Sequence, residues 1–155
     1  MHTLHASNFE LKIDASIDDI DLIPIISANT EAHVYVQSGA FSGAAEWTMD
    51  AVALAEFSNE LMELYTLLSG RAKLTALYRE TDFIEFEALK GGHIKVHGYL
   101  STAWECEQSL TFENHIDQTY LKCFAEGLFH EFSCYLDKKY TKHRFKNMKN
   151  RSRQL

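Results

Sequence analysis

Two histidines and a lysine on one predicted strand are the first residues whose spacing could support chemistry. His93, Lys95 and His97 alternate with apolar residues, so they share one face of an extended segment. Neighbours on one strand face lie about 7 Å apart, which separates the two imidazoles by about 14 Å, too far for both to bind one metal ion. Polar side chains on the solvated face of a sheet explain this spacing better than a metal site does.

Cys106 is the next candidate, because an activated thiol can act as a nucleophile. Its neighbours are Glu105 and Glu107, and carboxylates raise the pKa of a thiol, which is the opposite of what a nucleophile requires. The sequence also lacks a glycine-rich phosphate loop, a G-x-S-x-G elbow and an H-E-x-x-H pair. We therefore expect no catalytic residue, no bound metal and no cofactor.

Carboxylates are the remaining groups that could bind a partner, and they form two sets. The N-terminal set consists of Asp14, Asp18, Asp19 and Asp21. This set lacks the glycine and the closing glutamate of a calcium-binding loop. The second set follows one face of a predicted helix and consists of Glu56, Glu60 and Glu63. We expect both sets to be exposed, and either could form the contact with a basic protein.

The charge of the chain is unevenly distributed. Residues 138–155 hold eight of the 15 Lys and Arg residues and no Asp or Glu, whereas residues 1–137 carry seven basic and 22 acidic side chains, a balance of −15. An acidic body repels nucleic acid and accelerates association with basic proteins. The basic extension could bind RNA or DNA, or fold back on the acidic body. We favour a basic protein partner and consider nucleic acid unlikely, although the acidity could also serve solubility alone.

Two amphipathic helices are expected to position these groups. In the first, over residues 50–70, apolar residues recur at steps of three and four, and the glutamates fall on the solvated arc. Asp50 is expected to cap its N-terminus and Gly70 to take the left-handed turn that ends it. The second helix, over residues 117–136, begins at Asp117, whose carboxylate is expected to accept the N–H of Thr119 or Tyr120.

The remaining segments alternate between polar and apolar residues, which is typical of half-buried strands. Before the first helix we expect strands over 8–13, 20–26 and 32–37, a flexible link over 38–45 and a short extended piece over 46–49. Between the helices, four strands form an antiparallel meander over residues 71–115. The predicted fold is α+β, a single antiparallel sheet of about six or more strands packed with two main amphipathic helices. Its expected core includes Leu61, Leu64, Phe86, Val96, Leu110, Phe112, Leu121, Phe124 and Leu128.

Length and composition indicate one domain. The chain has 155 residues and 46% hydrophobic content, which is enough for a core without disulfides or metal. We expect a single domain over residues 1–137 and a basic extension over 138–155 that either prolongs the second helix or forms a mobile tail. The longest apolar run is far shorter than the roughly 18 residues of a membrane helix, and the N-terminus lacks a signal-peptide pattern. These features predict a cytoplasmic protein.

Four features of the chain follow one another in a recognisable order. They are Phe41-Ser42-Gly43, the capped helix that ends at Gly70, the strand pair around residues 92–98, and the run from Leu110-Thr111-Phe112 to Asp117-Gln118-Thr119-Tyr120-Leu121. Over about residues 38–137 this order resembles the Wap-type (WapI-like) immunity proteins of bacterial polymorphic toxin systems. The resemblance implies a non-catalytic inhibitor that binds and blocks a cognate toxin.

Taken with the acidity of residues 1–137, the resemblance predicts that the two carboxylate sets meet a basic toxin domain. The alternative is a small cytoplasmic binding or scaffolding domain in which a homodimer is possible. A neighbouring toxin gene would distinguish the two.

Overall fold

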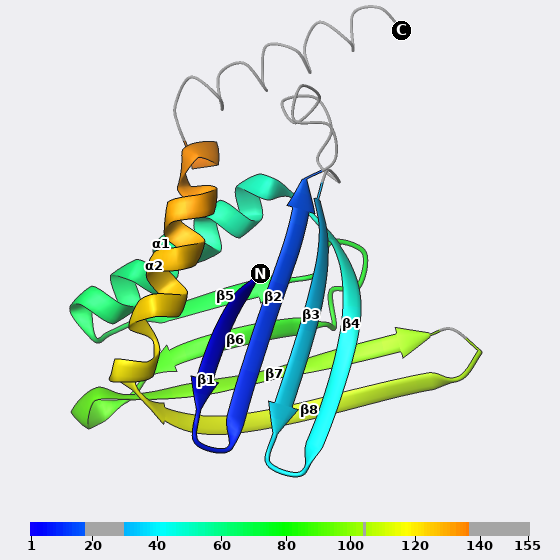
Figure 1. Ribbon diagram of the computed structural model, residues 1–155, viewed down its shortest axis with the longest axis horizontal. Helices are drawn as coiled ribbons and strands as arrows, with labels where there is room; N and C mark the ends of the chain where they lie inside the picture. The colour runs from blue at the N-terminus through cyan, green and yellow to red at the C-terminus, as the bar shows by residue number, and fades with distance from the viewer. Residues whose placement is uncertain (18–29, 104, 137–155) are drawn as a thin grey trace, which may run out of the picture.

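The computed structural model describes residues 1–17, 30–103 and 105–136, and within these ranges it contains two four-stranded antiparallel sheets and two α-helices (Figure 1). The N-terminal sheet comprises β1 (His2–Ala6), β2 (Phe9–Ile17), β3 (Thr30–Ser38) and β4 (Phe41–Met49). The C-terminal sheet comprises β5 (Arg71–Thr75), β6 (Phe83–Ala88), β7 (His93–Ala103) and β8 (Glu107–Asp117). The helices are α1 (Ala51–Leu67) and α2 (Lys122–Phe132).

The α+β class and the 71–115 meander are confirmed, but the expectation of a single sheet is wrong. Strand order follows the sequence within each sheet, and α1 carries the chain from β4 in one sheet to β5 in the other. Figure 1 shows the strands of the two sheets crossing at a steep angle, with both helices beside the sheets. Each sheet has one apolar face, so packing the two faces together buries both.

The structure before α1 differs from the prediction over residues 38–45, and β1 was not predicted. The segment expected to be a flexible link over 38–45 is a hairpin, in which β3 and β4 pair from Ser38↔Phe41 to Thr30↔Met49. Gly39 makes the turn with φ +61°, and Ala45, Trp47 and Met49 point inward. The strand expected over residues 20–26 lies outside the described residues.

Aromatic rings join the layers in the core. Phe9 from the N-terminal sheet stacks on Phe112 from the C-terminal sheet, with ring centroids 5.9 Å apart. Phe86 lies between the helices, 6.0 Å from Phe57 of α1 and 6.1 Å from Phe124 of α2. All nine expected core residues are buried except Leu110, which is partly buried and packs against the core.

A buried carboxylate that was not predicted from the sequence also links the two sheets. Asp82, between β5 and β6, is fully buried. Its carboxylate accepts hydrogen bonds from Trp47 Nε1 of β4 (3.3 Å) and from the Ser101 backbone N (2.8 Å) and Oγ (2.6 Å) of β7. These three donors provide the hydrogen bonds that a buried carboxylate requires.

The predicted caps are present, with one shift. Asp50 Oδ1 accepts the N–H of Val52 at 2.9 Å. The residue that ends α1 in the left-handed conformation is Leu68 (φ 51°), whose N–H donates to the Leu64 carbonyl, while Gly70 follows with φ +91°. The prediction for Gly70 is therefore right about its positive φ and wrong about its place as the cap.

Asp117 caps a 3-10 turn rather than α2 itself. Its Oδ1 accepts the N–H of Thr119 at 2.9 Å, as predicted, and the turn is η3 (Gln118–Tyr120). The expected helix over 117–136 is thus divided into η3, α2 and a second 3-10 turn, η4 (Ser133–Leu136). Tight turns of this kind are common at helix ends.

We predict that Leu61→Ala and Phe124→Ala each lower the free energy of unfolding by about 2–5 kcal/mol, because both side chains are buried and leave cavities. Denaturant unfolding measures the loss. Leu67→Ala is the control, since Leu67 is 68% exposed and its removal should change stability by less than about 0.5 kcal/mol. An unchanged unfolding midpoint for either core variant would refute this core.

Replacing Asp82 by alanine should lower stability by at least about 2 kcal/mol, because three donors, one buried and two part-buried, lose their acceptor. Asp82→Asn keeps one acceptor oxygen and should lower the stability by less than Asp82→Ala does. Thermal unfolding of both variants checks this order, and a fully stable Asp82→Ala protein would show that the carboxylate does not hold the sheets together.

The Asp117 cap makes a pH-dependent contribution to stability. The hydrogen bond from the Thr119 N–H holds the pKa of Asp117 below its ordinary value of 3.8. The cap therefore stabilises the fold above pH 3.8, and the contribution is lost as the pH falls through the lower pKa of the folded state. We expect Asp117→Ala to lower Tm at neutral pH and to match the wild type in strong acid. A Tm difference that stays constant with pH would contradict this.

Candidate functional site

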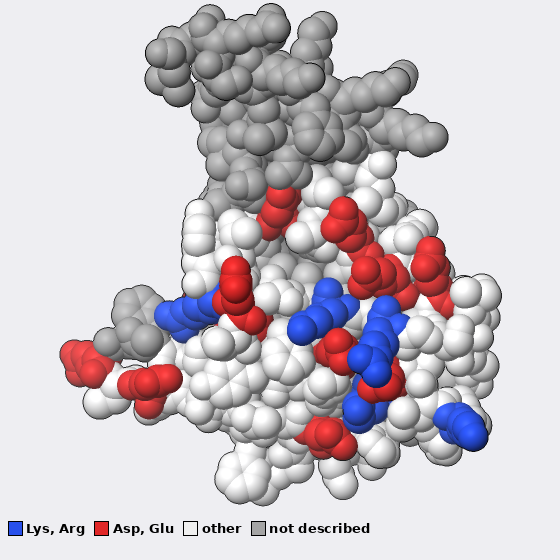
Figure 2. Space-filling view, turned by 180° about the vertical axis from the view of Figure 1, so that it is seen from behind, with Lys and Arg blue, Asp and Glu red and all other residues white. Residues whose placement is uncertain are grey.

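The glutamates of α1 form a row on its solvated side. Glu56, Glu60 and Glu63 are all exposed, while the opposite side of the helix is buried. Figure 2, seen from behind the view of Figure 1, shows a row of Asp and Glu side chains over α1, beside a mixed group of both charges. Here we call these three residues the α1 row.

The α1 row is not neutralised by neighbouring cations. Glu60 Oε2 accepts the backbone N–H of Lys73 in β5 at 3.3 Å, and Glu63 Oε1 accepts Asn59 Nδ2 at 3.2 Å. Within the described part of the chain, no Lys or Arg side chain forms an ion pair with any of the three. Their negative charge is therefore directed outward, and Glu60 places the row against the edge of the C-terminal sheet.

Asp14 is the one member of the N-terminal carboxylate set among the described residues, and it lies on another layer than the α1 row. Asp14 is exposed on the outer face of β2, 3.1 Å from the N-terminal ammonium group. The other three members of the set, Asp18, Asp19 and Asp21, lie outside the described residues. The structure thus assigns Asp14 and the α1 row to different layers of the fold.

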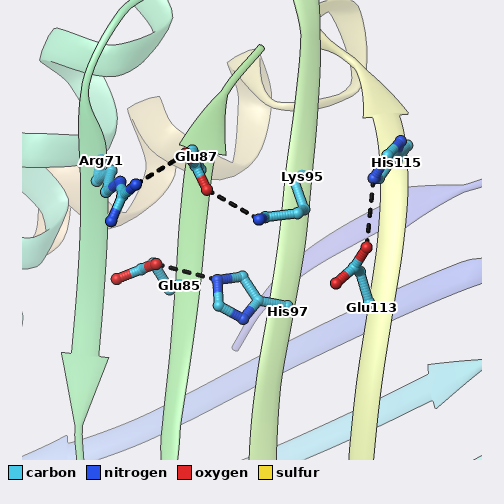
Figure 3. A network of polar contacts seen from close by, with 7 residues as sticks. All are labelled: Arg71, Glu85, Glu87, Lys95, His97, Glu113 and His115. Atoms are coloured by element: carbon cyan, nitrogen blue, oxygen red, sulfur yellow. Dashed lines mark hydrogen bonds and ion pairs between the residues drawn. The ribbon is translucent and has the colours of Figure 1, made fainter.

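Sequence reasoning missed the ionic pattern on the outer face of the C-terminal sheet. The strand register aligns Arg71, Glu87 and Lys95, and Figure 3 shows Glu87 between the two cations. Glu87 Oε1 lies 3.0 Å from Arg71 Nη2, and Glu87 Oε2 lies 2.9 Å from Lys95 Nζ. The Lys95 ammonium lowers the pKa of Glu87, and the Glu87 carboxylate raises the pKa of Lys95. These charges cancel locally, in contrast to those of the α1 row.

The same face contains the one group of side chains in the described ranges that could surround a metal ion. Ligand atoms of Glu85, Glu87 and His97 all lie within 4.8 Å of one another. Glu87 already binds two cations, and His97 Nε2 lies 3.0 Å from Glu85 Oε1, so a metal ion would have to displace these pairs. Spacing along a single strand does not reveal this group, because its members lie on two neighbouring strands. The absence of a metal stays a prediction.

Comparison with models of protein families gives a match over residues 8–136 to the Immunity protein WapI-like family. A search of curated proteins found no match. The family match begins earlier than the resemblance seen over residues 38–137 and therefore includes most of the N-terminal sheet. Among the described helices, none is long and apolar enough to cross a bilayer. The match covers well over half of the chain, which therefore belongs to the WapI-like family of immunity proteins.

Proposed function

We propose that this protein is a cytoplasmic, non-catalytic inhibitor that binds a cognate toxin and neutralises it, and that the α1 row faces a basic surface of that toxin. Membership of an immunity protein family supports the class of partner. The single observation that supports the contact surface is the exposed, uncompensated negative charge of Glu56, Glu60 and Glu63.

The charge pattern favours a protein with a basic surface over a nucleic acid. Residues 1–137 carry a balance of −15, which would repel the phosphate backbone. The same field attracts a basic domain and raises its rate of association, with a strong dependence on salt. Exposed carboxylates at the edge of an interface mainly set this rate. We expect the α1 row to act mainly on the association rate, because it is exposed and forms no ion pair with Lys or Arg among the described residues.

The N-terminal set is a separate candidate contact. Asp14, on the outer face of β2, marks where this set begins. We propose that Asp14, Asp18, Asp19 and Asp21 add to the attraction of the basic partner, with Asp14 contributing least because the N-terminal ammonium group lies 3.1 Å from its carboxylate. Their neutralisation can be tested independently of the α1 row.

We predict that the triple variant Glu56→Gln, Glu60→Gln and Glu63→Gln associates with the toxin at least about tenfold more slowly at low salt. The deficit should shrink as salt rises, because screening removes the long-range attraction. Glutamine keeps the acceptor oxygen that binds the Lys73 N–H, so the fold should be retained. Stopped-flow or surface plasmon resonance kinetics measure the rates, with the product of the adjacent toxin gene as partner.

The matched control neutralises three other exposed glutamates, Glu31, Glu105 and Glu107. It changes net charge equally, so equal slowing in both variants would show that acidity acts only through total charge. Co-expression tests the function itself. If the wild-type protein neither protects cells nor forms a complex with the adjacent-gene product, the immunity function is refuted and the scaffold alternative replaces it.

A further inference from the structure

An open hollow lies on the outer face of the C-terminal sheet, and no described helix or strand lies over it. It has a volume of about 860 Å³ and is lined by β5, β6, β7, β8 and the connection before β6. We call it the sheet hollow. Phe83 and Tyr99, which are directly opposite one another on β6 and β7, are its partly exposed aromatic residues.

We infer that the sheet hollow is the anchoring point of the toxin interface and takes an arginine side chain of the toxin. The inference rests on the function proposed above. It extends that function by naming the part of the surface that holds the complex together after the α1 row has attracted the partner.

The aromatic groups of the sheet hollow suit a flat cation. The face of Phe83 already receives a cation from the chain itself, since Lys73 Nζ lies 4.7 Å from its ring centroid, and the His97 ring meets it edge-on at 5.6 Å. Tyr99 makes no side-chain hydrogen bond or ring contact with any described residue. A guanidinium group stacks well on a ring of this kind.

The charges around the sheet hollow favour a cation over an anion. Glu113 and Glu80 line it and are exposed, against the single cation of Lys73. Glu113 lies 3.6 Å from His115 and close enough to Lys95 to raise the pKa of that ammonium, but within the described ranges it forms no direct ion pair with Lys or Arg, unlike Glu87, whose two oxygens are both paired. A carboxylate beside an aromatic ring can bind arginine through paired hydrogen bonds while the ring supports its plane.

The sheet hollow is continuous with the α1 row. Lys73 lines the hollow, and its backbone N–H donates to Glu60 of the row. One partner can therefore cover both at once. An interface in which a charged edge borders a central aromatic pocket is the usual arrangement of protein complexes, and arginine and tyrosine are enriched at the positions that contribute most to affinity.

The test measures binding kinetics of Tyr99→Ala and Glu113→Gln with the adjacent-gene toxin. We expect dissociation to become about tenfold faster or more for Tyr99→Ala, with little change in the association rate. Tyr99→Phe keeps the ring and should restore slow dissociation. Tyr78→Ala and Glu107→Gln are matched controls, because both residues are exposed and lie outside the hollow. Equal Tm values for the variants confirm that they fold.

Arginine itself is identified by chemical protection. The toxin is treated with phenylglyoxal, which blocks arginine, alone and in complex, and the modified peptides are mapped by mass spectrometry. We expect one toxin arginine to be protected by the wild type and to lose protection with Tyr99→Ala. If the wild type binds but Tyr99→Ala dissociates at the same rate, or no arginine is protected, this inference is overturned while the proposed function stands. If the wild type forms no complex with the toxin, both this inference and the proposed function are refuted.

Discussion

The fold depends on the burial of two sheets that are each apolar on one side only. Neither sheet would be stable alone with its apolar inner face in water. Packing the two inner faces together excludes water from both. Phe9 against Phe112 is one of the direct contacts between the sheets, and Phe86 joins the C-terminal sheet to both helices. This closure leaves the two outer sheet faces and the solvated sides of both helices exposed among the described elements.

The carboxylates of Asp82, Glu87 and the α1 row are in three different physical situations. Asp82 is buried and satisfied by three hydrogen bonds, so it serves the structure. Glu87 is held between two cations, so its field is cancelled close to the surface. Glu60 and Glu63 of the α1 row accept hydrogen bonds, and no described Lys or Arg forms an ion pair with the row, so its field extends into solvent. Recognition of a basic partner follows from this placement more than from net charge, because a cancelled carboxylate attracts nothing at a distance.

The sequence could predict what depends on local pattern. Alternation identified β5 to β8, periodicity identified the buried side of α1, and Asp117 was correctly expected to accept the Thr119 N–H. Alternation shows which face of a strand is buried but not what covers it, so the division into two sheets was missed. Because β4 begins with small residues, this part of the chain was predicted to be a flexible link, although it is a strand whose inward side chains include Trp47. Two contacts could not be predicted from local pattern. The contact of Glu85 with His97 depends on strand pairing, and that of Asp82 with Trp47 depends on tertiary packing.

The central claim is that the toxin covers the face formed by the α1 row and the sheet hollow. Carboxyl footprinting tests it most directly: free and toxin-bound protein are labelled with a carbodiimide and an amine, and the labelling of each Asp and Glu is compared by mass spectrometry. We expect Glu56, Glu60, Glu63 and Glu113 to lose labelling in the complex, while the exposed Glu31, Glu105 and Glu107 keep it. Protection of the second group with unchanged labelling of the first would show that the toxin binds elsewhere.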